Sequence, residues 1–341
     1  MKPSTLSTLT LIYAVTVAAT PTPSFLNSTL AITTQHSPRA RCGNGRSASN
    51  KQCCVWYDVL DDIQANLCVW VSLFLAFQCR EDAHDALRLS FHDAIGYSPL
   101  LKSRRLPGHS FLDGSIIKYA STELSYHPNA GLDDIVNDEK DLADKYGVSY
   151  GDIIQFAAAV SVRNCKGGPR IPFMAGRPDP TEPSPEHLVP EPFDSVDQIL
   201  ARVKDAGLTP QELVDLLASH SIGLQEHVDS TVAGMPLDTT PTVFDNNFYR
   251  EMLLPGFYWI GTDSVKGAVK SPFRTEFRLQ SDWALARDMR TIWEWLTLAM
   301  SQSLMANRFA TSMAKMALIG QNPRALTDCS EVIPLPRSRN N

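Results

Sequence analysis

The sequence predicts a mostly α-helical protein built of two lobes. Apolar residues recur at helical spacing in many stretches of the 341-residue chain, and the alternating Val/Ile pattern of strands is nearly absent. A Pro-rich passage from Arg177 to Pro192 cannot be helical throughout and divides the chain into halves. The length also exceeds the roughly 250–300 residues at which single cores stop growing. We therefore expect a first lobe over residues 40–184 and a second lobe with a C-terminal tail over residues 185–341, joined by short irregular ribbons.

Eight stretches carry the helical pattern. In chain order they are Tyr57 to Asn66, Ala83 to His92, Asp133 to Tyr146, Tyr150 to Val162, Ser195 to Ala206, Pro210 to Ile222, Thr291 to Leu298 and Phe309 to Ile319. In the second of these, Leu87 and Phe91 lie one turn apart, as one apolar face of a helix requires. The sixth opens with Thr209, Pro210 and Glu212, which is a capping box with proline in the first helical position.

Composition excludes several classes of protein. Hydrophobic residues make up 43% of the chain and charged residues 20%, the profile of an ordinary globular protein. The net charge of −6 argues against a nucleic-acid partner. No apolar run reaches the roughly 18–20 residues of a membrane span; the apolar stretch Leu67 to Phe77 is too short, so we expect a buried or misassigned segment. We expect a monomer with neither nucleic acid nor membrane as partner.

The N-terminus resembles a secretory leader. Lys2 precedes an apolar stretch from Leu9 to Ala19 that ends in small residues. A polar stretch without acidic residues then reaches Arg39. We therefore expect a signal peptide over residues 1–19, a pro-segment over residues 20–39 and an extracellular, secreted protein.

The chain has seven cysteines, which in a secreted protein indicate disulfides with one cysteine left over. They are Cys42, Cys53, Cys54, Cys68, Cys79, Cys165 and Cys329. The neighbours Cys53 and Cys54 cannot easily bond to each other, so each should pair with a distant partner. The residues alone leave the pairing open, and the CxxC spacing of a zinc site is absent.

Four ionisable residues form one stripe on the expected helix over Ala83 to His92. At 100° per residue the stripe spans about 60° of the helix surface; its members are Glu81, Asp85, Arg88 and His92. Such a stripe is often only a solvated face. However, an Arg one turn before a His, with Asp93 following, is not the pattern of a salt-bridge ladder. A His beside a guanidinium suits proton transfer from a bound peroxide.

His220 falls on the apolar face of the helix that Thr209 opens. It lies three, four and seven residues after Leu217, Leu216 and Leu213. A lone histidine among leucines is usually a core residue. The alternative is a haem-iron ligand, which must rise from an apolar pocket and needs a carboxylate on its other ring nitrogen.

Two oxygen-rich loops are candidates for calcium, which takes six to eight hard oxygen ligands. One loop set combines Asp93 with Asp113, Gly114 and Ser115; the other combines Ser221, Asp238, Thr240 and Asp245. Each set alone is weak evidence, because Asp-Gly and Asp-Ser pairs also simply form turns.

Several motifs together resemble the secreted fungal class II haem peroxidases, the ligninolytic group. They are Arg88 to Asp93, Ala218 to Gly223, His187 to Phe193, Leu279 to Asp282 and Thr327 to Ser330, and the resemblance covers Cys42 to Pro334. It implies a two-lobed helical fold with haem b between a distal and a proximal lobe. It also implies an enzyme that reduces hydrogen peroxide through a ferryl intermediate and then oxidises small one-electron donors, with a role in lignin degradation.

The resemblance also assigns roles around the haem. His92 is expected to be the distal acid–base and Arg88 the distal cation, with Phe91 beside the haem. Asn129 is expected to orient His92, with Glu123 supporting it. His220 is expected to be the proximal iron ligand and Asp282 its carboxylate partner.

Metal sites and disulfides follow from the same resemblance. The distal calcium is expected at Asp93, Phe111 (through its carbonyl), Asp113 and Ser115, and the proximal calcium at Ser221, Asp238, Thr240, Val243 (carbonyl) and Asp245. The implied disulfides are Cys42–Cys54, Cys53–Cys329 and Cys79–Cys165, which leaves Cys68 unpaired.

The electron donor is the open question. Some members use a surface Trp five positions before the proximal His, and here that position is Asp215. Others bind Mn²⁺ with three carboxylates, commonly Glu, Glu and Asp. The matching residues here are Glu81, Asp85 and Glu226, so the second acid is one methylene shorter and the third one methylene longer than in the common set. We expect Mn²⁺ as donor substrate. The alternatives are a generic low-potential peroxidase that oxidises small phenols at the haem edge, and a non-catalytic haem-binding secreted protein.

The chain departs from the family pattern in four places. Leu67 to Phe77 is longer and more apolar than the expected loop, and Gly108 to Leu112 replaces a run of glycines, so both suggest errors in the gene model. Leu237 stands where an aromatic residue usually packs near the proximal haem face. Trp293 occupies a position that is commonly Cys, and the tail that would carry its partner is missing.

Overall fold

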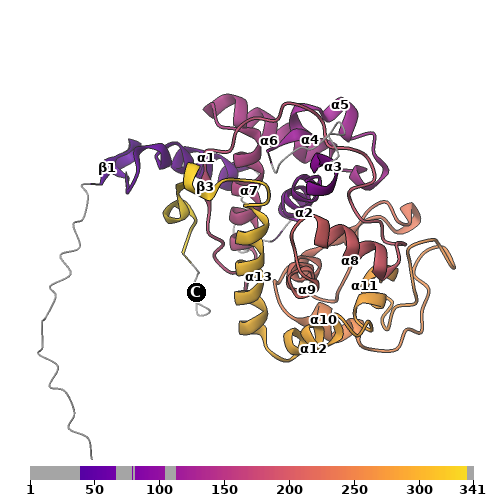
Figure 1. The fold of residues 1–341 in the computed structure, drawn as a ribbon. Helices are drawn as coiled ribbons and strands as arrows, with labels where there is room; N and C mark the ends of the chain where they lie inside the picture. The colour runs from indigo at the N-terminus through magenta and orange to yellow at the C-terminus, as the bar shows by residue number, and fades with distance from the viewer. Residues whose placement is uncertain (1–38, 67–78, 80, 104–112, 336–341) are drawn as a thin grey trace, which may run out of the picture. The chain divides into compact units, whose positions relative to one another are not determined.

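The computed structural model describes residues 39–66, 79, 81–103 and 113–335, all within one compact unit that runs from Pro38 to Asn341 (Figure 1). The expected signal peptide, most of the expected pro-segment, the stretches 67–77 and 108–112, Cys68 and Phe111 lie outside the described residues. Within the described ranges, none of the helices has the length and apolar character that a bilayer crossing requires.

The described chain is mostly helical, as predicted. The α-helices are α1 (Val55–Asn66), α2 (Glu81–Ile95), α3 (Pro99–Ser103), α4 (Ser115–Lys118), α5 (Ala120–Glu123), α6 (Asp133–Tyr146), α7 (Tyr150–Asn164), α8 (Val196–Asp205), α9 (Pro210–Leu216), α10 (Asn247–Met252), α11 (Gln280–Leu285), α12 (Ile292–Met300) and α13 (Gln302–Met316). All eight predicted helical stretches are present, whereas the short helices α3, α4, α5, α10 and α11 were not predicted. These have only four to six residues, too few for the apolar periodicity to show.

In the residues that the structure describes, strands are confined to three two-stranded antiparallel ribbons. β1 (Ala40–Arg41) pairs with β2 (Ser47–Ala48), β3 (Met174–Ala175) with β6 (Thr327–Asp328), and β4 (Leu224–Gln225) with β5 (Met235–Pro236). In the second ribbon Met174 lies opposite Asp328, so the C-terminal segment is held against the middle of the chain. Arg177 to Pro192 contains no helix, as its prolines predict.

The core is organised by two helix pairings. Helix α2 packs along α7, and α13 packs against α9 (Figure 1). The two stretches that carry His92 and His220 are therefore each packed against a long helix. In the N-terminal part, the rings of Trp56, Phe156 and Phe173 contact one another at centroid distances of 4.7 to 4.9 Å. Burial of aromatic area on this scale contributes strongly to stability.

Local sequence signals explain where the helix before His220 begins and ends. Thr209 Oγ1 accepts from the Glu212 amide at 3.1 Å and the Glu212 carboxylate accepts from the Thr209 amide at 2.8 Å, which confirms the predicted capping box. The predicted helix over Pro210 to Ile222 is wrong in its second half, because α9 stops at Leu216 and Leu217–Ile222 forms the 3₁₀ helix η4. The tighter 3₁₀ winding rotates the side chains that follow Leu216, so the direction of His220 differs from that on a continued α-helix.

The described residues contain three disulfides, two of which join segments that are distant in sequence. They are Cys42–Cys54, Cys53–Cys329 and Cys79–Cys165, which are the three pairs that the resemblance implies. The second closes the largest loop, with a sequence separation of 276 residues, and ties the N-terminal segment to the strand at the C-terminus. In the chain-entropy account such cross-links stabilise mainly by restricting the unfolded chain.

A buried ion pair holds the Pro-rich passage to the core. Asp152 on α7 and Arg177 are 2.7 Å apart, with side chains 5% and 0% exposed. The same carboxylate accepts from the amides of Gly176 and Arg177, and Arg177 Nη2 donates to the Ala317 carbonyl. Removal of one partner would leave the other charge buried and unpaired.

We therefore expect Asp152→Ala to lower the free energy of unfolding by about 3–5 kcal/mol, the usual cost of breaking a buried pair from one side. The measurement is thermal or denaturant unfolding of the variant. The exposed pair of Lys140 and Asp144 offers a matched control, and Asp144→Ala should leave the melting temperature almost unchanged. Equal losses in the two variants would contradict this account of the pair.

Candidate functional site

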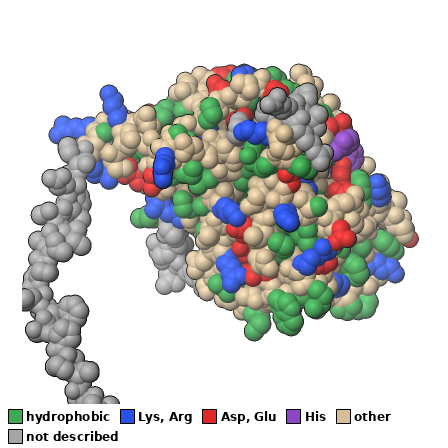
Figure 2. All heavy atoms as spheres, viewed as in Figure 1, with side chains coloured by type: hydrophobic (Ala, Val, Ile, Leu, Met, Phe, Trp, Pro, Cys, Tyr) green, Lys and Arg blue, Asp and Glu red, His purple; other side chains and the backbone are tan. Residues whose placement is uncertain are grey.

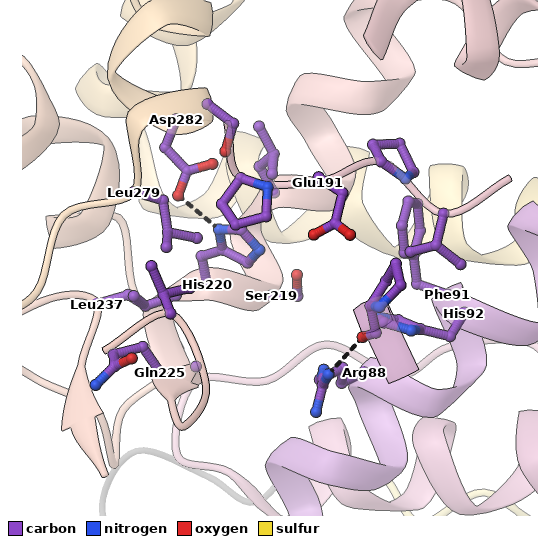
Figure 3. Close-up of a pocket in the computed structure, with 18 of the residues that line it drawn as sticks. Arg88, Phe91, His92, Glu191, Ser219, His220, Gln225, Leu237, Leu279 and Asp282 are labelled. Carbon is purple, nitrogen blue, oxygen red and sulfur yellow. Dashed lines mark hydrogen bonds and ion pairs between the residues drawn. The ribbon is translucent and has the colours of Figure 1, made fainter. Parts of the chain in front are cut away.

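A cavity of about 660 Å³ lies between α2, the segment after Pro190, and the α9–η4 segment. Apolar side chains form much of its lining, among them Leu213, Leu216, Leu217, Leu279 and Met313. Figure 3 shows His220 and Asp282 on one side of the cavity and Arg88, Phe91 and His92 on the other. The two histidines predicted from separate motifs therefore share one cavity.

His220 is fixed by a buried carboxylate. Its Nδ1 lies 2.9 Å from Oδ2 of Asp282. Asp282 belongs to α11 and is only 1% exposed. A carboxylate can only accept, so the proton is on Nδ1 and Nε2 keeps a lone pair. The His220 ring also contacts the edge of Phe248 at a centroid distance of 5.5 Å. An imidazole held in this tautomer is a ready metal ligand, and the carboxylate on its other nitrogen makes it more electron-rich.

His92 is fixed in the same way by an amide. Its Nδ1 is 2.7 Å from Oδ1 of Asn129, and Asn129 Nδ2 donates to the Glu123 carbonyl at 2.9 Å. This second bond sets the amide orientation, so the Asn129 oxygen accepts from His92 and Nε2 is again unprotonated. Glu123 therefore supports Asn129 through its backbone. Burial, together with the nearby Arg88 charge, lowers the pKa of His92 to about 3.

Arg88 is anchored one turn before His92. Its Nη2 donates to the carbonyls of Pro128 at 2.8 Å and Ala130 at 2.9 Å, in the segment that also carries Asn129. Burial lowers the pKa of Arg88, but a guanidinium remains charged in proteins. A fixed cation beside a neutral imidazole can stabilise negative charge that develops in the cavity.

The predicted stripe on α2 faces this cavity along its whole length. Glu81, Asp85, Arg88 and His92 all line it, and so does Glu226 after β4. Burial raises the pKa of Asp85 to about 6, and the charges of Glu81 and Glu226 add to this increase. The three carboxylates thus interact electrostatically. Nevertheless, in the described part of the chain no three His, Cys, Asp or Glu side chains converge closely enough to hold a metal ion as they stand.

Two of the residues predicted for the proximal calcium site have buried oxygens without a hydrogen-bond partner in the described structure. Asp238 Oδ1 accepts from the Thr240 amide at 2.7 Å, but Oδ2 has no hydrogen-bond partner in the described structure, and the same is true of Ser221 Oγ. Asp245 accepts from Thr240 Oγ1 at 3.1 Å. Burial, with help from the charges of Glu251 and Asp245, raises the pKa of Asp238 to about 8. Orphaned buried oxygens of this kind fit a hard cation.

The described residues predicted for the distal calcium site lie near the end of α2 and at the start of α4. Asp93 accepts from the Gly114 amide at 3.1 and 3.2 Å through its two oxygens. Burial raises its pKa to about 7, with the Glu123 charge as the next cause. Gly114 has φ of +84°, and a Cβ there would lie 2.4 Å from Cβ of Tyr150, so only glycine lets this loop reach α7. Asp113 and Ser115 are both buried.

Sequence reasoning missed other residues of the cavity. Glu191 lines the cavity (Figure 3). Its carboxylate pairs with Nδ1 of His127 at 2.8 Å. His84 lines it as well, and both of its ring nitrogens are buried without a hydrogen-bond partner in the described structure. Burial lowers the pKa of His84 to about 4. The one signal for His84 was its place one turn before Arg88 on the same helix face.

Two positions at which this chain differs from other family members, Leu237 and Asp215, are buried. Leu237 is buried and lines the cavity. Asp215 is only 6% exposed and accepts from Ser312 Oγ at 2.8 Å. Burial raises its pKa to about 7, with the Glu294 charge contributing. In this chain the position five residues before His220 is therefore not at the surface.

The known proteins that this chain matches are peroxidases. The family model described as "Peroxidase" matches residues 69–301, and "Fungal peroxidase extension region" matches residues 304–341. The chain is 45% identical to a versatile peroxidase of Pleurotus eryngii over 300 residues, which cover 88% of this chain and 80% of that protein. It is 44% identical to a ligninase of Phanerodontia chrysosporium, with coverage of 88% and 79%. It is 45% identical to a peroxidase of Arthromyces ramosus, with coverage of 88% and 80%.

Proposed function

The chain belongs to the fungal class II haem peroxidases, the family of ligninases and versatile peroxidases, and we propose that its cavity between His92 and His220 is where hydrogen peroxide is reduced. As a member it is a peroxide-dependent oxidoreductase, and the family binds haem. The observation that carries the proposal is that two imidazoles, each with Nδ1 hydrogen-bonded, line one apolar cavity.

The residues present fit haem b. The cavity is large and mostly apolar, as a site for a planar macrocycle must be. His220 would hold the iron through Nε2, with Asp282 increasing the electron density of the imidazole, and Phe91 and Leu237 would lie against the macrocycle. When bound, haem supplies the redox-active iron at which peroxide is reduced. In this proposal residues 40–184 form the distal lobe and residues 185–341 the proximal lobe.

The proton movements belong to His92. Its neutral Nε2 would take the proton from one oxygen of hydrogen peroxide and return it to the other oxygen, which leaves as water. Arg88 stabilises the negative charge that builds on the departing oxygen, while Asn129 keeps the His92 proton on Nδ1 throughout. Together these residues allow heterolytic cleavage of the O–O bond without a free hydroxide ion.

The donor we propose is Mn²⁺ at Glu81, Asp85 and Glu226. Burial raises the pKa of Asp85 and of Glu226, and the Glu81 charge adds to both increases, so the three carboxylates at this cavity edge are suited to a hard divalent cation. Because they do not converge as they stand, binding would draw Glu81, which is exposed, and the half-buried Glu226 toward Asp85. The relatives do not discriminate, since a versatile peroxidase, a ligninase and a plain peroxidase are equally similar to the chain.

Small phenols are the second candidate donor. The observation that favours them is the lack of a preformed three-ligand site, together with a cavity lined by Phe193 and by the pair of His127 and Glu191. The third interpretation, a non-catalytic haem-binding protein, is at odds with the intact arrangement of His92, Arg88 and Asn129. Secretion, two bound calcium ions, a monomeric state and a role in lignin degradation complete the proposal.

The rate of reaction with peroxide should depend little on pH between about 7 and 4. Because the pKa of His92 is lowered to about 3, the imidazole becomes protonated only near that pH, and above it the base is available. Stopped-flow mixing of the haem-loaded protein with peroxide measures the rate. A tenfold loss of rate for each pH unit below about 6 would show an imidazole with an ordinary pKa and contradict the prediction.

Glu81→Gln should raise the KM for Mn²⁺ by about tenfold or more, because loss of one anionic ligand weakens a three-carboxylate site. Steady-state formation of a Mn³⁺ chelate is the measurement, with oxidation of 2,6-dimethoxyphenol in parallel. Asp134→Asn, which removes an exposed acid on α6, is the control. Mn²⁺ oxidation that is unchanged in Glu81→Gln, or absent from the parent protein while the phenol is oxidised, would favour the phenol donor.

Calcium should govern how stability depends on pH. The pKa of Asp238 without an ion is raised to about 8, far above its value in the unfolded chain, so the folded state holds a proton that the unfolded chain has lost. Ion-free protein should thus lose stability as pH rises from about 4 to 8, and calcium should remove this slope. Melting temperatures at several pH values, with calcium and with a chelator, test this. Equal slopes in the two series would contradict the calcium sites.

A further inference from the structure

Trp283 is a partly exposed indole joined directly to the partner of His220. It lies in α11, is 38% exposed, and follows Asp282, which is 1% exposed. The carboxylate of Asp282 accepts from His220 Nδ1 at 2.9 Å. A route along the side chains and backbone of two neighbouring residues and across one hydrogen bond therefore leads from the protein surface to the imidazole that would hold the iron.

A cation covers one face of this indole. The guanidinium carbon of Arg287 lies 4.6 Å from the centroid of the Trp283 ring. Arg287 Nη1 donates to the carbonyls of Trp283 at 3.0 Å and Met252 at 3.2 Å, so the guanidinium is held in place. A cation over the ring stabilises the reduced indole and opposes loss of an electron. Once oxidised, such an indole is a stronger oxidant than a solvated one.

The other indoles in the described chain lack this combination. Trp293 on α12 is 69% exposed, and Figure 2 shows hydrophobic side chains gathered along the edge where α12 lies. The Trp293 carbonyl accepts from Thr297 Oγ1, and within the described residues no hydrogen bond links Trp293 to His220 or Asp282. Trp295 is fully buried, and its Nε1 donates to the Tyr249 carbonyl. Trp56 is buried in the N-terminal core, and Trp259 packs in a separate cluster.

We propose that Trp283 is an electron-entry residue for aromatic donors that are too bulky for the cavity, such as phenolic polymers. This inference rests on the proposed function, because peroxide reduction in the cavity supplies the oxidant. The indole gives one electron to the peroxide-oxidised enzyme through Asp282 and His220 and releases its Nε1 proton to water. A phenol unit then returns one electron and one proton, which restores the indole and leaves a phenoxyl radical.

The exposed face of the ring is where the donor would dock. A phenol unit can stack on an exposed indole, and the Arg287 and Arg290 guanidiniums on the same segment attract anionic substituents of a polymer. Arg290 is paired with Asp288 and Asp197, so this attraction is partly offset. Transfer at the surface therefore needs no opening of the cavity.

The experiment compares Trp283→Phe with the matched control Trp293→Phe in haem-loaded full-length protein. Electron paramagnetic resonance after peroxide is added without donor should show a tryptophan radical in the parent and in Trp293→Phe, and none in Trp283→Phe. Peptide mass spectrometry should find an added oxygen atom on Trp283. Turnover of lignosulfonate, a sulfonated aromatic polymer, should fall about tenfold or more in Trp283→Phe, with oxidation of 2,6-dimethoxyphenol within about twofold of the parent.

Two results would overturn the inference while leaving the proposed function intact. One is a radical that persists unchanged in Trp283→Phe. The other is lignosulfonate turnover that survives the substitution while the small phenol is oxidised normally. A parent protein that reacts with neither donor would instead refute the proposed function. The haem absorbance and melting temperature of both variants show whether a loss comes from misfolding, and Trp283→Tyr, which keeps an oxidisable ring, should recover part of the polymer turnover.

Discussion

The rest of the site depends on a hydrogen bond at Nδ1 of each of two histidines. Asp282 holds the proton of His220 and Asn129 holds that of His92, so each ring has an unprotonated Nε2 on the cavity side. One imidazole is thereby suited to bind a metal and the other to accept a proton. The two hydrogen-bond acceptors differ in charge, and each suits the role of its histidine. The carboxylate increases the electron density of the His220 imidazole, whereas a neutral amide beside Arg88 leaves His92 a weak base.

The fold keeps these two hydrogen bonds in place by several independent means. Helix α2, which carries Arg88 and His92, packs on α7, and the disulfide from Cys79 to Cys165 joins their ends. The capping box at Thr209 sets the start of α9, and the change to 3₁₀ winding after Leu216 directs His220 toward Asp282 on α11. The Pro-rich passage, which lines the cavity near Glu191, is held by the buried pair of Asp152 and Arg177. Loss of any of these would displace one wall of the cavity relative to the other.

Much of this could be predicted from the sequence, because its signals are local. The stripe on α2 and the capping box need only helical geometry, and all members of the stripe do line the cavity. The resemblance implied the disulfides, which no spacing could have given. The change to 3₁₀ winding at Leu217 occurs where the chain packs against α10 and α13, and no local sequence pattern records that packing. The burial of Asp215 and the unpartnered nitrogens of His84 likewise depend on neighbours far away in the chain.

The most direct test of this account is the rate at which the haem-loaded protein reacts with peroxide when His92 is replaced by Leu. The substitution leaves His220 and Asp282 untouched, so haem should remain bound with its absorbance close to that of the parent. Stopped-flow spectroscopy should then show a reaction slower by roughly 10²–10⁴-fold, the usual contribution of one general acid–base. A variant that binds haem and reacts with peroxide at the parent rate would show that His92 does not move the proton, and the account of the cavity would be wrong.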